Sequence, residues 1–185
     1  VAGLNTAPAV LTDGQQDDML RLTFTHRGRV GDTALEPATL ALLFEEVAGD
    51  PLTSAEANAL IAELSIWADD GSGVFEAAAD TAVASLTTLT LTGGLMTWAL
   101  PDGDAALSVA ATTSKDFFVV VRLQADASAQ TPNQFRVVHV PGSGTSAEDR
   151  DHDIVLAMEP ALDTASTILS ALSVPPPTMD PEPLW

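Results

Sequence analysis

The stretch MLRLTFT, residues 19–25, decides the class of fold. Its apolar residues Leu20, Leu22 and Phe24 alternate with an arginine and two threonines. Successive side chains of an extended chain point to opposite faces, so this alternation gathers the apolar residues on one face. The stretch therefore predicts a β-strand with one face in a hydrophobic core.

Similar short stretches recur along the chain, separated by turn-forming Gly, Pro, Asp and Asn residues. They are TLALLFEE (39–46), LTLT (89–92), MTWAL (96–100), ALSVA (106–110), FFVVVRL (117–123), QFRVVHV (134–140) and DIVLAM (153–158). FFVVVRL is apolar on both faces, which favours a central strand. We therefore predict an all-β fold, an antiparallel β-sandwich of about eight or nine strands.

One segment, LTSAEANALIAEL at 52–64, has the pattern of a helix instead. Thr53 and Glu56 have the spacing of a capping box, in which two side chains satisfy the first backbone N–H groups of a helix. The apolar residues that would share one helical face are Leu60, Ile61 and Leu64. We predict one short helix over 53–64 that covers an end of the sandwich.

The two ends of the chain differ from its body. Residues 1–14 are small and mostly apolar, which predicts an apolar N-terminal segment or strand. Residues 163–174 fit a helix or a strand equally well, and PPPTMDPEPLW at the C-terminus is a proline-rich arm that cannot join a sheet interior. We expect a β-sandwich domain over 15–160 and a C-terminal segment with this arm over 161–185.

The acidic composition limits the kinds of partner. Seven Lys and Arg residues stand against 26 Asp and Glu residues, which gives a formal net charge of −19. Such a surface repels nucleic acids and attracts divalent cations. We expect no nucleic-acid partner and a salt-rich or calcium-rich setting. No stretch approaches the ~20 consecutive apolar residues of a membrane helix, so we expect no transmembrane segment.

The loop WADDGSGVFEAAADT, residues 67–81, is the strongest candidate site. Calcium binding needs several oxygen atoms that converge from a sharply turned backbone, and two glycines allow the turn. The candidate ligands are Asp69, Asp70, Ser72, Glu76 and Asp80. Ala68 stands where the D-x-D-G-x-G pattern has its first Asp. A calcium site and a plain polar hairpin turn therefore both stay open.

Two further acidic groups lie elsewhere in the chain. AEDRDHD, residues 147–153, predicts a flexible acidic loop or a second metal site. Asp17, Asp18, Asp32 and Glu36 lie close in sequence to several arginines, which favours local ion pairs. The chain has no cysteine nucleophile, G-x-S-x-G elbow, H-E-x-x-H motif or phosphate-binding glycine loop, so we expect no enzyme.

The stretches 17–44, 50–81 and 133–156 together resemble β-sandwich modules of large secreted bacterial surface proteins. The resemblance covers about residues 15–160 and rests on DDGSGVFE and on the NQFRV and EDRDHD ending. Such modules are similar to immunoglobulin-like and cadherin-like repeats, which occur in tandem and often hold calcium near their ends. The resemblance implies an extracellular or cell-surface role that is structural or adhesive.

Two functions follow as expectations. The first is a non-catalytic structural module or subunit of a surface assembly or filament, which contacts copies of itself head-to-tail or neighbouring modules. Its uncharged ends, 1–12 and 164–174, would add strands to a neighbour's sheet or pair within their own domain, and Trp185 on the proline-rich arm would dock onto a neighbour. The alternative is a calcium-stabilised adhesion or carbohydrate-binding module.

Overall fold

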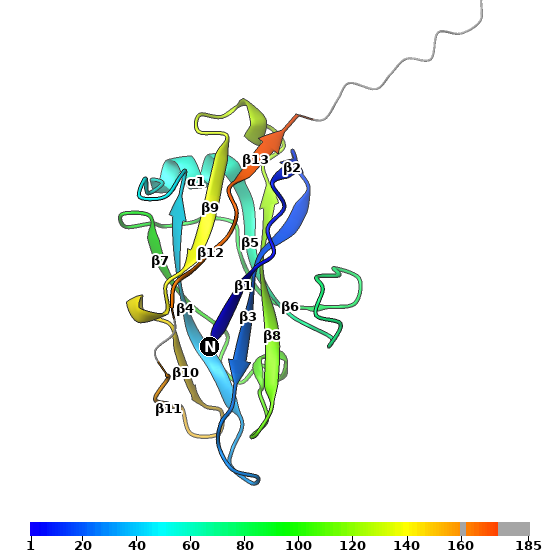
Figure 1. Ribbon diagram of the computed structural model, residues 1–185, viewed down its shortest axis with the longest axis vertical. Helices are drawn as coiled ribbons and strands as arrows, with labels where there is room; N and C mark the ends of the chain where they lie inside the picture. Colours follow the sequence, from blue (N-terminus) through cyan, green and yellow to red (C-terminus); the bar gives the residue numbers. More distant parts are fainter. Residues whose placement is uncertain (160–161, 174–185) are drawn as a thin grey trace, which may run out of the picture.

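The computed structural model describes residues 1–159 and 162–173 and folds them into two β-sheets (Figure 1). The first sheet contains, in spatial order, β1 (Ala2–Asn5), β3 (Gln16–Thr25), β8 (Ser114–Leu123), β5 (Ile61–Ala68) and β6 (Thr81–Leu86). The predicted all-β sandwich is confirmed. The proline-rich arm and Trp185 lie outside the described residues.

The second sheet has eight strands. Its main path is β11 (Ile154–Val155), β10 (Ser146–Asp149), β4 (Leu35–Glu45), β9 (Gln134–His139), β13 (Leu169–Leu172) and β2 (Val10–Thr12). Two more strands lie off this path: β7 (Leu95–Ala99) pairs with β4, and β12 (Thr164–Ala165) pairs with β9. All pairs in both sheets are antiparallel except β13 with β2, which are parallel.

The alternating stretch at 19–25 forms the end of β3, as predicted. Leu20, Leu22 and Phe24 are buried between the sheets, whereas the residues between them are partly exposed. β8 is the central strand of its sheet, and all five residues from 117 to 121 are buried. FFVVVRL therefore forms the central strand that its two apolar faces predicted.

The predicted capping box is present, but the helix is shorter than predicted. Thr53 Oγ1 accepts a hydrogen bond from the backbone N–H of Glu56, and Glu56 Oε2 accepts one from the N–H of Thr53. Helix α1 covers only Ser54–Leu60, and strand β5 begins at Ile61. The boundary at Leu64 was wrong because pairing with β8 and β6 holds this apolar segment extended.

Three predicted strands are absent or much reduced. ALSVA gives way to the 3-10 helix η1 (Ala105–Leu107), and DIVLAM contributes only the two residues of β11. LTLT lies beside α1, and side chains of α1 make the backbone hydrogen bonds that a neighbouring strand would otherwise make. Asn58 accepts the N–H of Leu89 and donates to its C=O. Short 3-10 helices also occur at η2 (Ala127–Ala129) and η3 (Pro141–Ser143).

The end segments pair within their own chain. β1 pairs with β3 in the first sheet, and β2 joins the second sheet beside β13. The segment at 163–174 takes the strand alternative, as β12 and β13. No helix among the described residues is long and apolar enough to cross a membrane.

Candidate functional site

The loop at 69–80 connects β5 to β6 and brings three of the predicted ligands together. Carboxylate oxygens of Asp69, Asp70 and Asp80 lie within 4.8 Å of one another. Ser72 Oγ lies 3.4 Å from Asp69 Oδ1, so it belongs to the same group. Glu76 contributes its backbone N–H, which donates to Asp80 Oδ2, and its carboxylate is not part of this group.

Hydrogen bonds within the loop occupy these carboxylates. Asp80 accepts the N–H groups of Asp70 and Glu76 at 3.0 and 2.8 Å. Asp69 accepts the N–H of Gly73 with both oxygens, each at 3.1 Å. These bonds are those of an ordinary acidic turn, and a carboxylate has about four lone-pair sites, so capacity for a cation remains. The geometry is compatible with both alternatives drawn from the sequence.

The loop is anchored to the outer face of the first sheet. The Phe75 ring packs edge-on against Trp67 at 5.5 Å and against Phe118 at 5.8 Å between ring centroids. Arg21 Nη1 donates to the C=O of Gly73 at 2.7 Å. An apolar contact and a charged hydrogen bond therefore fix the acidic part of the loop to β5, β8 and β3.

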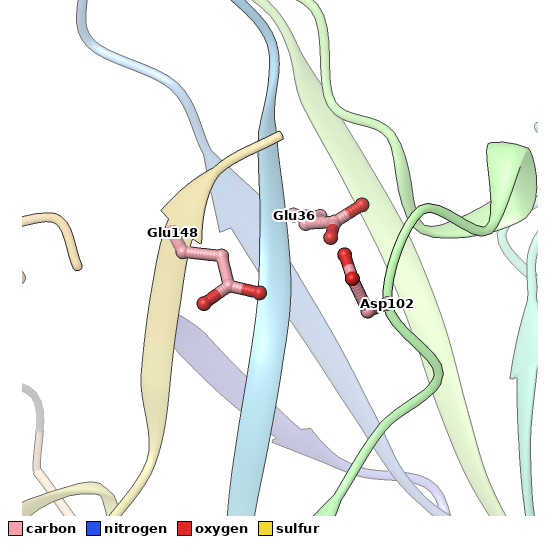
Figure 2. A group of neighbouring side chains, drawn as sticks. All are labelled: Glu36, Asp102 and Glu148. Atoms are coloured by element: carbon pink, nitrogen blue, oxygen red, sulfur yellow. The ribbon is translucent and has the colours of Figure 1, made fainter. Parts of the chain in front are cut away.

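A second carboxylate cluster joins residues that the sequence assigned to different groups. It contains Glu36 on β4, Asp102 in the segment after β7 and Glu148 on β10, with oxygens within 4.8 Å of one another. Figure 2 shows Glu36 and Asp102 pointing toward each other, with Glu148 on the neighbouring strand. Glu36 and Glu148 are direct partners in the β4–β10 register.

Burial dominates the electrostatics of this second cluster. The Glu36 side chain is only 1% exposed, and burial raises its pKa, with Asp102 and Glu148 acting in the same direction. The backbone N–H of Gly103 donates to Glu36 Oε1 at 3.1 Å. Arg150 Nε lies 3.6 Å from Glu36 Oε2, too far for a hydrogen bond. Burial and the charge of Asp153 raise the pKa of Glu148 as well.

The acidic stretch at 147–153 does not form one metal site among the described residues. Neighbouring strand residues point in opposite directions, and Glu148 faces Glu36 while Asp149 faces elsewhere. The Thr33 hydroxyl and His152 both hydrogen-bond Asp149 and lower its pKa to about 2. This carboxylate therefore holds the loop at the end of β10.

The local ion pairs expected around Asp17, Asp18, Asp32 and Glu36 are not those observed. Arg21 pairs with Asp116 on β8, and Arg27 pairs with Glu159. Both partners are distant in sequence, so short-range proximity was a poor guide to charge pairing across the sheets.

A cavity of about 430 Å³ opens at one end of the sandwich. Its lining is mixed: apolar side chains such as Phe24, Leu35, Leu156 and Met158 lie beside polar groups that include His26. His26 Nδ1 accepts the N–H of Gly28, and Nε2 donates to the C=O of Thr33. Both ring nitrogens therefore hold the 26–33 loop, which gives this histidine a structural task.

The chain matches no protein-family model, and a search of curated proteins gives no match.

Proposed function

We propose that this protein is a non-catalytic structural module of an extracellular or cell-surface assembly that joins copies or neighbouring modules head-to-tail. One observation carries the proposal: the edges of the eight-stranded sheet expose apolar side chains on an otherwise acidic body. Val10 on β2 and Leu172 on β13 are 51% and 48% exposed at one edge. Ile154 and Val155 on β11 are 60% and 69% exposed at the other.

Charge supports contact at the edge formed by β2 and β13. A net charge of −19 makes copies repel one another over most of their surface. Residues 1–12 and 164–173 carry no charged side chain, and they supply β1, β2, β12 and β13. Attraction exceeds repulsion most easily where the surface is neutral and apolar, and salt or calcium reduces the remaining repulsion.

Backbone geometry supports the same contact. β2 and β11 are the terminal strands of one sheet, and an edge strand offers free N–H and C=O groups to another chain. Figure 1 shows β2 near the upper end of the molecule and β11 at the lower left. Contact between β11 of one copy and β2 of the next uses two different surfaces, so it is heterologous, and it extends into a filament when the rotation between copies does not close a ring.

The test measures molar mass by light scattering in high salt over a range of protein concentrations. We expect the unmodified protein to associate, and the variants Val10→Lys and Val155→Lys to remain monomeric. Val74→Lys is the matched control, because Val74 is 64% exposed in the loop at 69–80, which is anchored to the first sheet and not to either edge of the second. Equal mass for the unmodified protein and all three variants would show that these edges carry no assembly contact.

The loop at 69–80 favours a second candidate function, a calcium-stabilised adhesion or carbohydrate-binding module. The convergence of Asp69, Asp70 and Asp80 is the specific observation behind it. The two candidates separate experimentally, since the first requires association through the sheet edges and the second requires a calcium response of the monomer.

A further inference from the structure

The carboxylates of Glu36, Asp102 and Glu148 lie close enough to repel one another when they are ionised. Glu36 and Glu148 lie directly opposite each other on adjacent strands, where like charges destabilise a sheet. Asp102 adds a third carboxylate from the segment after β7 (Figure 2). Three chain segments that are distant in sequence therefore direct negative charge to one point.

The buried oxygen of Glu36 is an independent sign that a ligand belongs there. Glu36 Oε2 is shielded from solvent and accepts no hydrogen bond. Arg150 Nε is 3.6 Å away and also lacks a hydrogen-bond partner, while Arg150 Nη2 donates to the C=O of Gly103 at 3.0 Å. Buried polar atoms in native proteins nearly always have a partner, because an unmatched one loses the hydrogen bonds that it would make with water.

The charge balance defines the partner. Three carboxylates and the guanidinium of Arg150 leave two negative charges in excess when all three acids are ionised. One divalent cation would cancel this excess and supply a partner for Glu36 Oε2. All the available ligands are oxygen atoms. Hard cations such as Ca²⁺ and Mg²⁺ prefer such ligands, whereas softer metals prefer thiolate or imidazole ligands.

We propose that Glu36, Asp102 and Glu148 form a binding site for a divalent cation of the calcium class. Two ligands come from adjacent strands of one sheet and the third from a connecting segment. The bound cation fixes the segment that follows β7 to β4 and β10. Water completes the six to eight oxygen ligands that calcium takes. This site is separate from the loop at 69–80, whereas Glu148 is the direct register partner of Val155 on β11 and so adjoins the proposed sheet-edge contact.

The first test is calorimetric titration of the full chain, freed of metal by chelation, with CaCl₂ and then MgCl₂. A high NaCl concentration suppresses unspecific attraction of cations to the acidic surface. We expect saturable calcium binding whose affinity falls at least about tenfold, or 1.4 kcal/mol, in Asp102→Asn and in Glu148→Gln. Both variants keep the size of the side chain, and Glu36 is left in place because its burial makes misfolding a risk.

The matched controls are Asp69→Asn and Asp80→Asn, which remove charge from the other acidic loop. They should leave the proposed site intact. Absence of saturable binding, or binding that only these loop variants reduce, would overturn the proposal. A shared proton between Glu36 and Asp102 is the competing solution. Carboxyl carbon NMR that shows one of them protonated at neutral pH, with no response to calcium, would overturn it too.

Discussion

Glu45 and Arg136 lie directly opposite each other on β4 and β9, and Arg136 Nε and Nη2 both donate to Glu45 Oε2, at 2.8 and 2.6 Å. The other oxygen of Glu45 accepts the N–H of Gly49 at 2.8 Å. The Glu45 side chain is 7% exposed, so removal of Arg136 leaves a buried charge without its partner. We expect Arg136→Met to lower the free energy of unfolding by about 3 kcal/mol, measured by urea denaturation.

The first sheet contains a natural control for this prediction. Arg122 and Glu63 also pair across neighbouring strands, at 2.8 Å, but both side chains are considerably more exposed. Arg122→Met should cost less than about 1 kcal/mol, because water solvates the remaining carboxylate. Equal losses in the two variants would contradict the role assigned to burial.

His139 makes the fold sensitive to acid. Burial lowers its pKa from 6.5 to about 4, so the folded protein binds a proton less readily than the unfolded chain. The stabilising contribution is complete above pH 6.5 and is lost as the pH falls toward 4. Its size is at most about 3 kcal/mol. We expect His139→Gln to reduce the loss of stability on acidification, measured by denaturation between pH 7 and 4.

His152→Gln is the control for this measurement, because His152 is exposed and its pKa is raised by the Asp149 carboxylate. This shift has the opposite sign, so His152 does not produce instability in acid. If the His139 variant followed the pH profile of the unmodified protein, another buried group would be responsible.

Asp18 affects the pH dependence of stability in the opposite direction to His139, because its contribution is lost as the pH rises. Burial raises its pKa from 3.8 to about 6, so the folded state favours the protonated carboxyl. This stabilising contribution is present below pH 3.8 and is lost as the pH rises through 6. Asp18→Asn should therefore gain up to about 3 kcal/mol relative to the unmodified protein between pH 4 and 7. Asp50→Asn is the control, because Asp50 is exposed, and it should show no such gain. A stability difference between Asp18→Asn and the unmodified protein that stays constant with pH would refute the prediction.

The calcium hypothesis for the loop at 69–80 predicts a mass-action effect. Calcium at a hundredfold excess over its dissociation constant raises the free energy of unfolding by about 2.7 kcal/mol. Asp70→Ala should lose the part of this response that belongs to the loop, measured as a shift in melting temperature. NaCl at matched ionic strength is the necessary control, since any cation screens a net charge of −19. A response unchanged in Asp70→Ala would leave the loop as a plain turn.

Elements specified by local pattern could be predicted from the sequence. The alternation at Leu20, Leu22 and Phe24 and the doubly apolar run of β8 identified strands correctly, because burial of one or both faces determines such patterns. The capping box was equally local, since Thr53 and Glu56 need only each other. In each case, the decisive interactions involve neighbouring residues or burial alone.

Elements decided by long-range pairing could not be predicted in this way. The apolar spacing at Leu60, Ile61 and Leu64 suited a helix, but contacts with β8 moved the boundary to Leu60. The same distinction between local and long-range contacts applies to the candidate metal ligands. Asp69, Asp70 and Asp80 are close in sequence and were found, whereas Glu36 and Glu148 meet only through the β4–β10 register.

The parallel pairing of β2 with β13 has a mechanical consequence. Residues 10–12 lie beside residues 170–172, so a strand near the start of the chain runs in the same direction as the last described strand. Tension applied at the beginning of β2 and the end of β13 pulls the two strands past each other along their length. The hydrogen bonds between them then share the load simultaneously and do not open one after another. A module joined to neighbours at both ends would therefore resist stretching through the paired β2 and β13. Its lifetime under force would depend on the rate at which the hydrogen bonds between these two strands break.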